Sequence, residues 1–132
     1  MTWPQCFFER ALAINEKTLG PGHSSTATTA SNLAGLLQTL GYYEEAKQLY
    51  KRALTILEET LGSNHPSTGT ALNNLANHLF TTGYYEEAKP FSERALAISE
   101  KTMGINHLDT IRIRKNHKKL VKFIQKAKNK KN

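Results

Sequence analysis

A 42-residue repeat limits what this chain can fold into more than any other feature. Aligned without gaps, residues 25–66 and 67–108 share 24 identical positions, far more than chance gives. The segment GYYEEAK occurs intact at 41–47 and again at 83–89. The similarity therefore comes from duplication of a structural unit and not from biased composition.

Each repeat predicts two helices joined by a tight turn. Apolar residues recur at helical spacing in the first helix, and Gly41 and Gly83 follow its end, where glycine readily adopts a left-handed conformation. We expect this helix to begin near Ser25 and Ser67, whose hydroxyls can cap free backbone N–H groups. A second helix follows, with glutamates in its first turn. The stripes predicted to be buried are Ala30, Leu33, Ala34 and Leu37; Leu72, Leu75, Ala76 and Leu79; and Ala46, Leu49, Tyr50, Ala53, Leu54, Ile56, Leu57 and Leu61.

The repeat also predicts how the chain is divided into segments. The first segment matches only the second half of a unit, so its helix lacks a hairpin partner. In all, about six helices are expected. A three-residue shift would place Leu120, Val121 and Ile124 on the core stripe of the last helix. The segments are 4–24 (half repeat and loop), 25–66 and 67–108 (complete units), 109–126 (terminal capping helix) and 127–132 (basic, disordered tail).

Small and large residues alternate in a characteristic way through each unit. Leu33-Ala34 and Leu75-Ala76 stand in the first helices, and Gly41, Tyr43, Ala46, Tyr50 and Ala53 stand around and inside a second helix. This pattern resembles the tetratricopeptide repeat (TPR), and the Leu-Gly-x-x-His loops and the period are similar to the kinesin light chain type. The resemblance covers roughly residues 5–110. It implies an all-α fold, a right-handed α-solenoid of helix-turn-helix repeats.

The resemblance also implies a function, which is protein–protein interaction. In that family the first helices line a concave groove that holds an extended peptide or a partner helix. A solvated polar face is the alternative interpretation, but three asparagines on one helix are poor helix formers and can bond a peptide backbone. Carried over by position, the groove residues are Thr28, Ser31, Asn32, Gln38, Thr70, Asn73, Asn74, Asn77, Phe80 and Thr81.

Charge is distributed unevenly along the chain. Residues 1–111 carry 8 Lys/Arg and 11 Asp/Glu, whereas residues 112–132 carry 10 Lys/Arg and no acid. The favoured interpretation of the basic end is a solubilising cap, because a terminal repeat needs one polar face. The alternative function is binding of an acidic partner, nucleic acid or an anionic membrane, which we consider less favoured. This basic patch comprises Lys115, Lys118, Lys119, Lys122 and Lys126.

No constellation of catalytic residues is recognised, so we expect neither an enzyme nor a small-molecule substrate. His23, His65 and His107 recur at the repeat period, one in each inter-unit loop. Successive helical pairs would hold them roughly 10 Å apart, too far for one metal ion. We therefore expect a structural role for them, with no metal and no cofactor.

Three further expectations concern single features. Pro90 falls inside a predicted helix and predicts a local kink or a later helix start. The unpaired first helix would expose Trp3, Phe7 and Phe8, which suggests self-association or docking on a partner. One cysteine, Cys6, and an N-terminus without a secretory pattern make the cytoplasm the default location.

Overall fold

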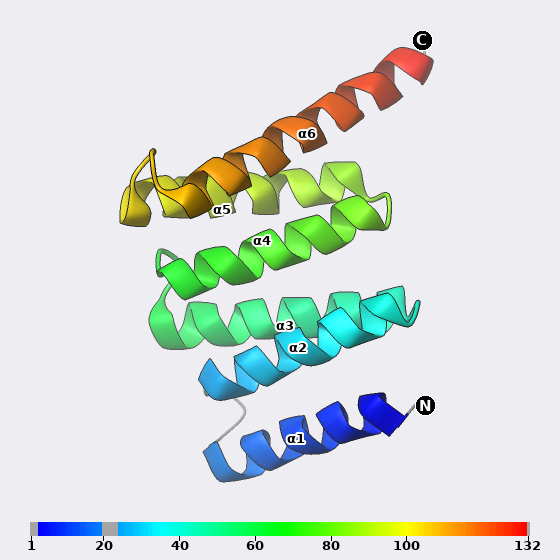
Figure 1. Ribbon diagram of the computed structural model, residues 1–132, viewed down its shortest axis with the longest axis vertical. Coiled ribbons are helices and arrows are strands. Elements are labelled where there is room, and N and C mark those ends of the chain that lie inside the picture. The colour runs from blue at the N-terminus through cyan, green and yellow to red at the C-terminus, as the bar shows by residue number, and fades with distance from the viewer. Residues whose placement is uncertain (1–2, 20–23, 132) are drawn as a thin grey trace. The chain divides into compact units, whose positions relative to one another are not determined.

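The computed structural model describes residues 3–19 and 24–131 of the chain (Figure 1). In this part of the chain the backbone forms six α-helices and no β-strand. No helix among these residues is long and apolar enough to cross a membrane. The helices form two compact units, unit 1 in Met1–Ser63 and unit 2 in Asn64–Asn132.

Unit 1 contains a helical hairpin and one additional helix. Helices α2 and α3 pack along each other, and α1 packs against α2. An ion pair between Glu16 and Arg52 also joins α1 to α3. The helices are α1 (Trp3–Leu19), α2 (Ser24–Thr39) and α3 (Tyr43–Leu61).

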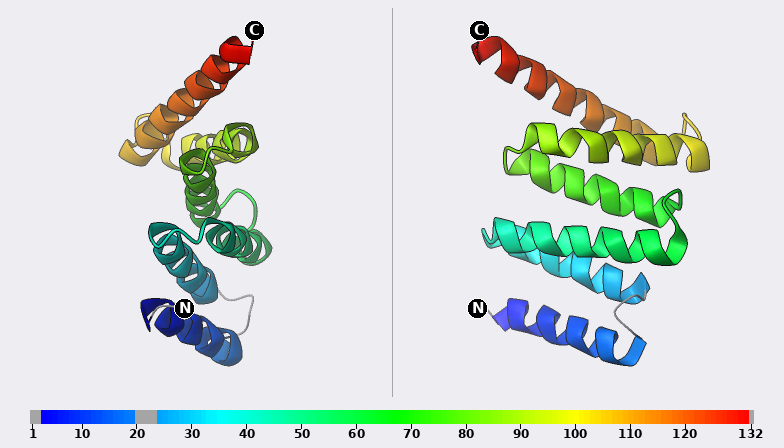
Figure 2. Two further views of the ribbon diagram at one scale, coloured as in Figure 1. Left: turned by 90° about the vertical axis from the view of Figure 1, so that its right-hand side faces the viewer. Right: turned by 180° about the vertical axis from the view of Figure 1, so that it is seen from behind.

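Unit 2 contains the second hairpin and the basic helix. Helices α4 and α5 form the hairpin, α6 packs against α5, and the side of α6 also touches α4. In both views of Figure 2 the C-terminal part of α6 leans away from α5, and residues 125–130 are all exposed. The helices are α4 (Pro66–Thr81), α5 (Tyr85–Met103) and α6 (Leu108–Lys131).

The predicted apolar stripes form the core of each unit. All eight stripe residues of α2 and α4 are buried, and so are Ala46, Tyr50, Ala53, Leu54, Ile56 and Leu57 of α3. Leu49 is half-buried and Leu61 is exposed. In α6 the shifted register is confirmed for Leu120 and Ile124 but not for Val121, which is exposed.

Glycine ends both second helices. Gly62 follows α3 and Gly104 follows α5, and each has a φ of +92°, in the left-handed region that favours glycine. The Gly62 N–H donates to the Glu58 carbonyl at 3.2 Å, and the Gly104 N–H donates to the Glu100 carbonyl at 3.1 Å. These bonds satisfy carbonyls that the helix ends would otherwise leave open.

The prediction that serine caps the first helices is wrong for α4. His65 is the N-cap, and its Nδ1 accepts a hydrogen bond of 3.1 Å from the Ser67 N–H. Pro66 occupies the first helical position, where its missing N–H removes no helical bond. One repeat later, His107 Nδ1 accepts a bond of 3.1 Å from the Asp109 N–H. Two of the recurring histidines are thus helix caps, and His23 lies outside the described residues.

Two further expectations are corrected at the helix ends. Helix α5 begins at Tyr85, the position equivalent to Tyr43 in α3, so Pro90 does not delay its start. A local bend at Pro90 stays a prediction. Helix α6 continues to Lys131, so residues 127–131 are helical, not disordered as expected. Gln125, Ala127 and the lysines of this segment are good helix formers and no glycine or proline interrupts it, so the sequence is compatible with the longer helix.

Buried threonines recur at the repeat period, a feature that the hydrophobic pattern does not reveal. Thr26, Thr68 and Thr110 are fully buried near the starts of α2, α4 and α6. In unit 2 the Thr110 and Ser99 hydroxyls lie 2.7 Å apart, and Thr110 Oγ1 also lies 3.3 Å from the Ser99 carbonyl. These bonds hold the start of α6 against the end of α5.

Candidate binding surface

The predicted groove residues of unit 1 lie on one polar edge of α2. Thr28 and Asn32 are exposed, and Ser31 and Gln38 are half-buried. Gln38 Oε1 accepts a long hydrogen bond of 3.5 Å from the buried Tyr50 hydroxyl on α3. Gln38 therefore has a packing role as well as a place on the predicted surface.

The predicted groove residues of unit 2 lie along α4, a helix without any acidic or basic side chain apart from His78. Thr70, Asn77 and Thr81 are exposed, Asn74 is half-buried, and Asn73 is only 9% exposed. The Thr70 hydroxyl donates to the Pro66 carbonyl at 3.2 Å. The exposed amides of α4 thus present both hydrogen-bond donors and acceptors on a neutral helix face.

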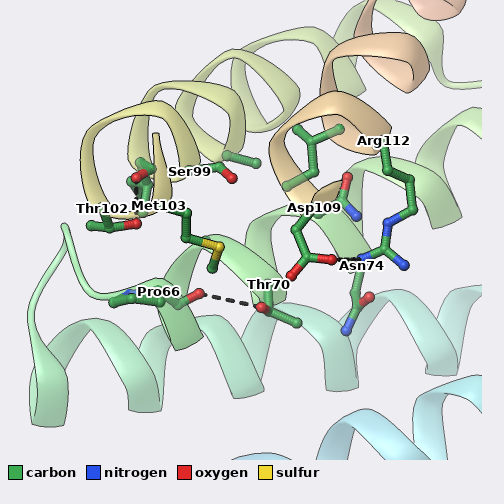
Figure 3. A pocket seen from close by; sticks show the side chains of 13 residues that line it. Pro66, Thr70, Asn74, Ser99, Thr102, Met103, Asp109 and Arg112 are labelled. Atoms are coloured by element: carbon green, nitrogen blue, oxygen red, sulfur yellow. Dashed lines mark hydrogen bonds and ion pairs between the residues drawn. The ribbon is translucent and has the colours of Figure 1, made fainter. Parts of the chain in front are cut away.

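A small cavity of about 60 Å³ opens beside the N-terminal half of α4, between α4, α5 and α6 (Figure 3). Its apolar lining includes Ala95, Ile98 and Met103 of α5 and Ile113 of α6. At its base α4 approaches α5 closely. A side chain at Gly69 would bring its Cβ to only 3.0 Å from Ile98 Cγ2, so the absence of a side chain at Gly69 permits this approach. The cavity could accept a small apolar group, but nothing larger without movement of the side chains.

Polar side chains surround the mouth of this cavity. Figure 3 shows Asp109 and Arg112 of α6 opposite Thr70 and Asn74 of α4. Arg112 Nη2 lies 3.5 Å from Asp109 Oδ1, one helical turn away, and the Arg112 side chain is 67% exposed. Asn73 also lines the cavity. The mouth therefore combines a carboxylate, a guanidinium and amides, groups that bond the N–H and C=O of a peptide.

Aromatic rings gather at the opposite end of α4. The Phe80 ring centroid lies 5.3 Å from that of Tyr85 on α5 and 5.0 Å from that of Phe123 on α6. The Tyr85 and Phe123 centroids are 5.5 Å apart. Lys119 Nζ lies 5.5 Å from the Phe80 centroid, within cation–π range. Phe123 remains 38% exposed, so this aromatic cluster reaches the surface.

Sequence reasoning missed the contribution of α6 to this surface. Asp109 and Arg112 line the cavity, and Lys119 and Phe123 contact the aromatic cluster. With Asn116 they are spaced three or four residues apart, so they follow one face of α6. That spacing was available in the sequence, but the last helix matches the earlier first helices only weakly, so its register could not be aligned with theirs.

The remaining candidates for chemistry have structural partners. Ser92 Oγ and His117 Nδ1 lie 2.9 Å apart between α5 and α6, where Ser92 is buried. Burial of Tyr50 raises the pKa of its phenol above 10.0. Among the described residues no three His, Cys, Asp or Glu side chains form a metal-binding cluster.

Of two other predicted sets of residues, the structure describes the side chains of one. Every lysine of the basic patch is exposed on α6: Lys115, Lys118, Lys119, Lys122 and Lys126. The side chains of Trp3, Phe7 and Phe8 lie outside the described part of the structure. The proposed self-association through them stays a prediction.

Comparison with known proteins identifies relatives of this architecture. A family model described as Tetratricopeptide repeat matches residues 7–59, 25–101 and 67–122. No curated protein matches the chain.

Solved structures give a second, independent comparison. A putative kinesin light chain from Podosopora anserina with nearly identical TPR-like repeats matches with a TM-score of 0.80 and 28% identity, covering 88% of this chain and 55% of that one. BtubC (BKLC) from P. vanneervenii matches with a TM-score of 0.81 and 25% identity, covering 89% and 47%. A single-residue variant of the first protein has a TM-score of 0.70 and 25% identity, covering 97% and 68%. This chain thus spans about half the length of the first two structures.

Proposed function

Because the chain belongs to the tetratricopeptide repeat family, of kinesin light chain type, we propose that it is a non-enzymatic module that binds a protein segment along its first helices. TPR repeats generally mediate protein–protein interaction. The all-α fold matches that of TPR solenoid structures. The one observation that carries the proposal is the surface that α4 and α6 form in unit 2.

The dimensions of this surface suit a short extended peptide. Thr70 at the cavity and Phe80 in the aromatic cluster are ten residues apart on α4, which is about 15 Å at 1.5 Å per residue. An extended chain advances about 3.3 Å per residue. A segment of about five residues would therefore reach from the cavity to the aromatic cluster.

The chemistry of the surface gives each part of such a peptide a contact. The cavity takes a small apolar side chain, and the aromatic cluster takes a larger one. Between them, the Asn74 and Asn77 amides are exposed enough to bond the peptide backbone. Backbone bonding gives affinity without selecting a sequence, so the two end contacts would provide the selectivity.

The proposal extends to unit 1 by position. Thr28, Ser31 and Asn32 occupy on α2 the places that Thr70, Asn73 and Asn74 occupy on α4. Neither helix carries a Lys, Arg, Asp or Glu side chain. The same kind of backbone contact is therefore proposed for α2. The exposed single cysteine, Cys6, supports the cytoplasm as the place of binding.

The test is selection from a displayed library of random peptides, followed by calorimetry with the peptides obtained. We expect the double variant Asn74→Ala/Asn77→Ala to bind them at least about fivefold more weakly, since each lost hydrogen bond contributes about 0.5–1.5 kcal/mol. Asn129→Ala, an exposed asparagine near the end of α6, is the matched control and should bind normally. Peptides that bind all three proteins equally would refute the proposed surface.

A further inference from the structure

The outer face of α6 presents a continuous line of positive charge. The helix carries ten Lys/Arg and a single acid, Asp109. Lys115, Lys122 and Lys126 are spaced seven and four residues apart, so they form one stripe, flanked by Lys118 on one side and by Lys119, which also contacts Phe80, on the other. All five residues of the basic patch are exposed. None of the charge is therefore hidden in the core of unit 2.

The one acid of α6 does not neutralise this stripe. Asp109 lies at the cavity beside α4, where it pairs with Arg112. It is six residues before Lys115, and that spacing places it on another face of the helix. Helix α6 itself therefore offers the basic patch no carboxylate partner, and the nearest acids lie on α5, where Glu86 and Glu93 line a hollow with Ile124 and Lys128.

Two large aliphatic side chains are exposed next to this patch. Ile105, in the loop between α5 and α6, is 59% exposed, and Leu108, the first residue of α6, is 77% exposed. Leu108 precedes Lys115 by seven residues, so it begins the same stripe. From Leu108 to Lys126 the stripe is about 27 Å long at 1.5 Å per residue.

The repeat shows that these aliphatic residues are not needed to build the loop. One unit earlier, Ser63 and Pro66 occupy the positions of Ile105 and Leu108, and that loop has the same glycine φ and the same histidine cap. In the later loop Arg114 Nη2 also donates to the Ile105 carbonyl at 3.1 Å. Ile105 and Leu108 are therefore exposed at a junction that is held in place by hydrogen bonds. The earlier junction folds without aliphatic residues at these two positions, so folding alone does not require them.

We propose that this face of α6 docks on an anionic lipid surface, with Ile105 and Leu108 entering the interface and the basic patch lying on the headgroups. A neighbouring helix would have to desolvate several lysines without partners, which is costly. A nucleic-acid duplex would attract the lysines but has no use for an aliphatic pair at one end. An apolar tip with a basic stripe matches the chemistry of a lipid interface. From sequence alone a solubilising cap is the favoured role of the lysines. The exposed Ile105 and Leu108 favour the lipid-binding role instead, because a solubilising cap has no need of exposed aliphatic side chains.

The experiment is co-sedimentation of the full chain with vesicles of phosphatidylcholine alone and with about one-third phosphatidylserine. We expect binding only to the anionic vesicles, weakening as salt rises. Lys115→Gln/Lys122→Gln/Lys126→Gln should lower the partition coefficient by about a hundredfold, on the basis of three near-surface lysines. Lys17→Gln/Lys89→Gln/Lys101→Gln, three exposed lysines outside the basic patch, is the control of equal net charge and should bind normally.

The role of Ile105 and Leu108 is tested by replacing them with Ser and Pro, the residues at the equivalent positions 63 and 66 of the earlier repeat. Ile105→Ser/Leu108→Pro should bind anionic vesicles about tenfold more weakly, because the apolar contribution is lost. Its affinity for a short DNA duplex should not change. Circular dichroism checks that each variant is folded. No binding to anionic vesicles, equal binding to neutral ones, or full binding by the loop variant would overturn the proposal, and a preference for the duplex would identify a nucleic-acid surface instead.

Discussion

Tyr50 and Ser92 occupy the same position in successive repeats, yet each unit uses its hydroxyl differently. The Tyr50 ring fills the α2–α3 interface and its hydroxyl reaches Gln38 in the same hairpin. Ser92 is too short to fill this space, and its hydroxyl bonds His117 of α6 instead. The substitution between the repeats thus changes which helix the hydroxyl at this position contacts.

The buried Tyr50 gives the protein a defined response to alkali. Because burial raises the pKa of Tyr50, its phenol stays protonated in the folded state above pH 10.0, whereas the unfolded chain ionises. Its contribution to stability is therefore complete below pH 10.0 and is lost as the pH rises beyond it. We expect Tyr50→Phe to lose less stability than the wild type over that range, measured by urea unfolding at stepwise pH.

The control for this prediction is Tyr43→Phe, a change at an exposed tyrosine of the same helix. It should follow the wild-type pH dependence. Equal losses in Tyr50→Phe and Tyr43→Phe would argue against Tyr50 as the source of the effect.

Pro90 is a position at which the two repeats differ in backbone chemistry inside a helix. It lies inside α5 and has no N–H to donate, whereas the matching residue in α3 is Gln48. We expect Pro90→Gln to raise the free energy of unfolding by about 1–3 kcal/mol, since it restores one helical hydrogen bond. The measurement is thermal unfolding followed by circular dichroism, with the neighbouring exposed change Lys89→Gln as the control. A lowered midpoint in Pro90→Gln would show that the proline suits its place.

At the scale of elements, the aromatic cluster is what connects all three helices of unit 2. Phe80 of α4, Tyr85 of α5 and Phe123 of α6 contact one another with tilted and edge-on rings. Such pairs contribute about 0.5–1.5 kcal/mol beyond the area that they bury. The cluster therefore couples the position of α6 to that of the hairpin.

A double-mutant cycle measures this coupling. We expect Phe80→Leu and Phe123→Leu each to destabilise the chain, and the pair to cost less than the sum by about 0.5–1.5 kcal/mol. Phe80→Leu combined with Val121→Ala, an exposed change on another face of α6, should be additive. Additive costs for the two phenylalanines would mean that α6 is held without this contact.

The same helices show where sequence reasoning succeeds and where it stops. Two aligned copies reveal the spacing of Leu33 and Leu75, so burial of the α2 and α4 stripes could be predicted. The N-cap residues could not be predicted in the same way. Serine is a common N-cap residue, and the pattern does not show that His65 Nδ1 accepts the hydrogen bond from the Ser67 N–H. Helix α6 has only a weak counterpart, so Arg112 and Phe123 were not assigned to the surface that they help to form.

At the scale of the whole molecule, stability should be distributed unevenly. In each unit the hairpin helices bury most of the core, whereas residues 125–130 of α6 are exposed on all sides. We expect amide hydrogen exchange to be slowest in α4 and α5 within unit 2 and fastest in the last turns of α6, with opening free energies at least about 2 kcal/mol apart. Protection of residues 125–130 equal to that of α4 would show that the end of α6 is packed.

The histidine caps have a consequence for how such a chain can lengthen or shorten. Each junction before α4 and α6 contains its own stop, a glycine at position 62 or 104, and its own start, a histidine three residues later. An unequal genetic crossover between the two copies would join one junction to the other in frame and leave both signals intact. Whole repeats of this chain can therefore be gained or deleted, and each remaining junction still contains a glycine that ends one helix and a histidine that caps the next.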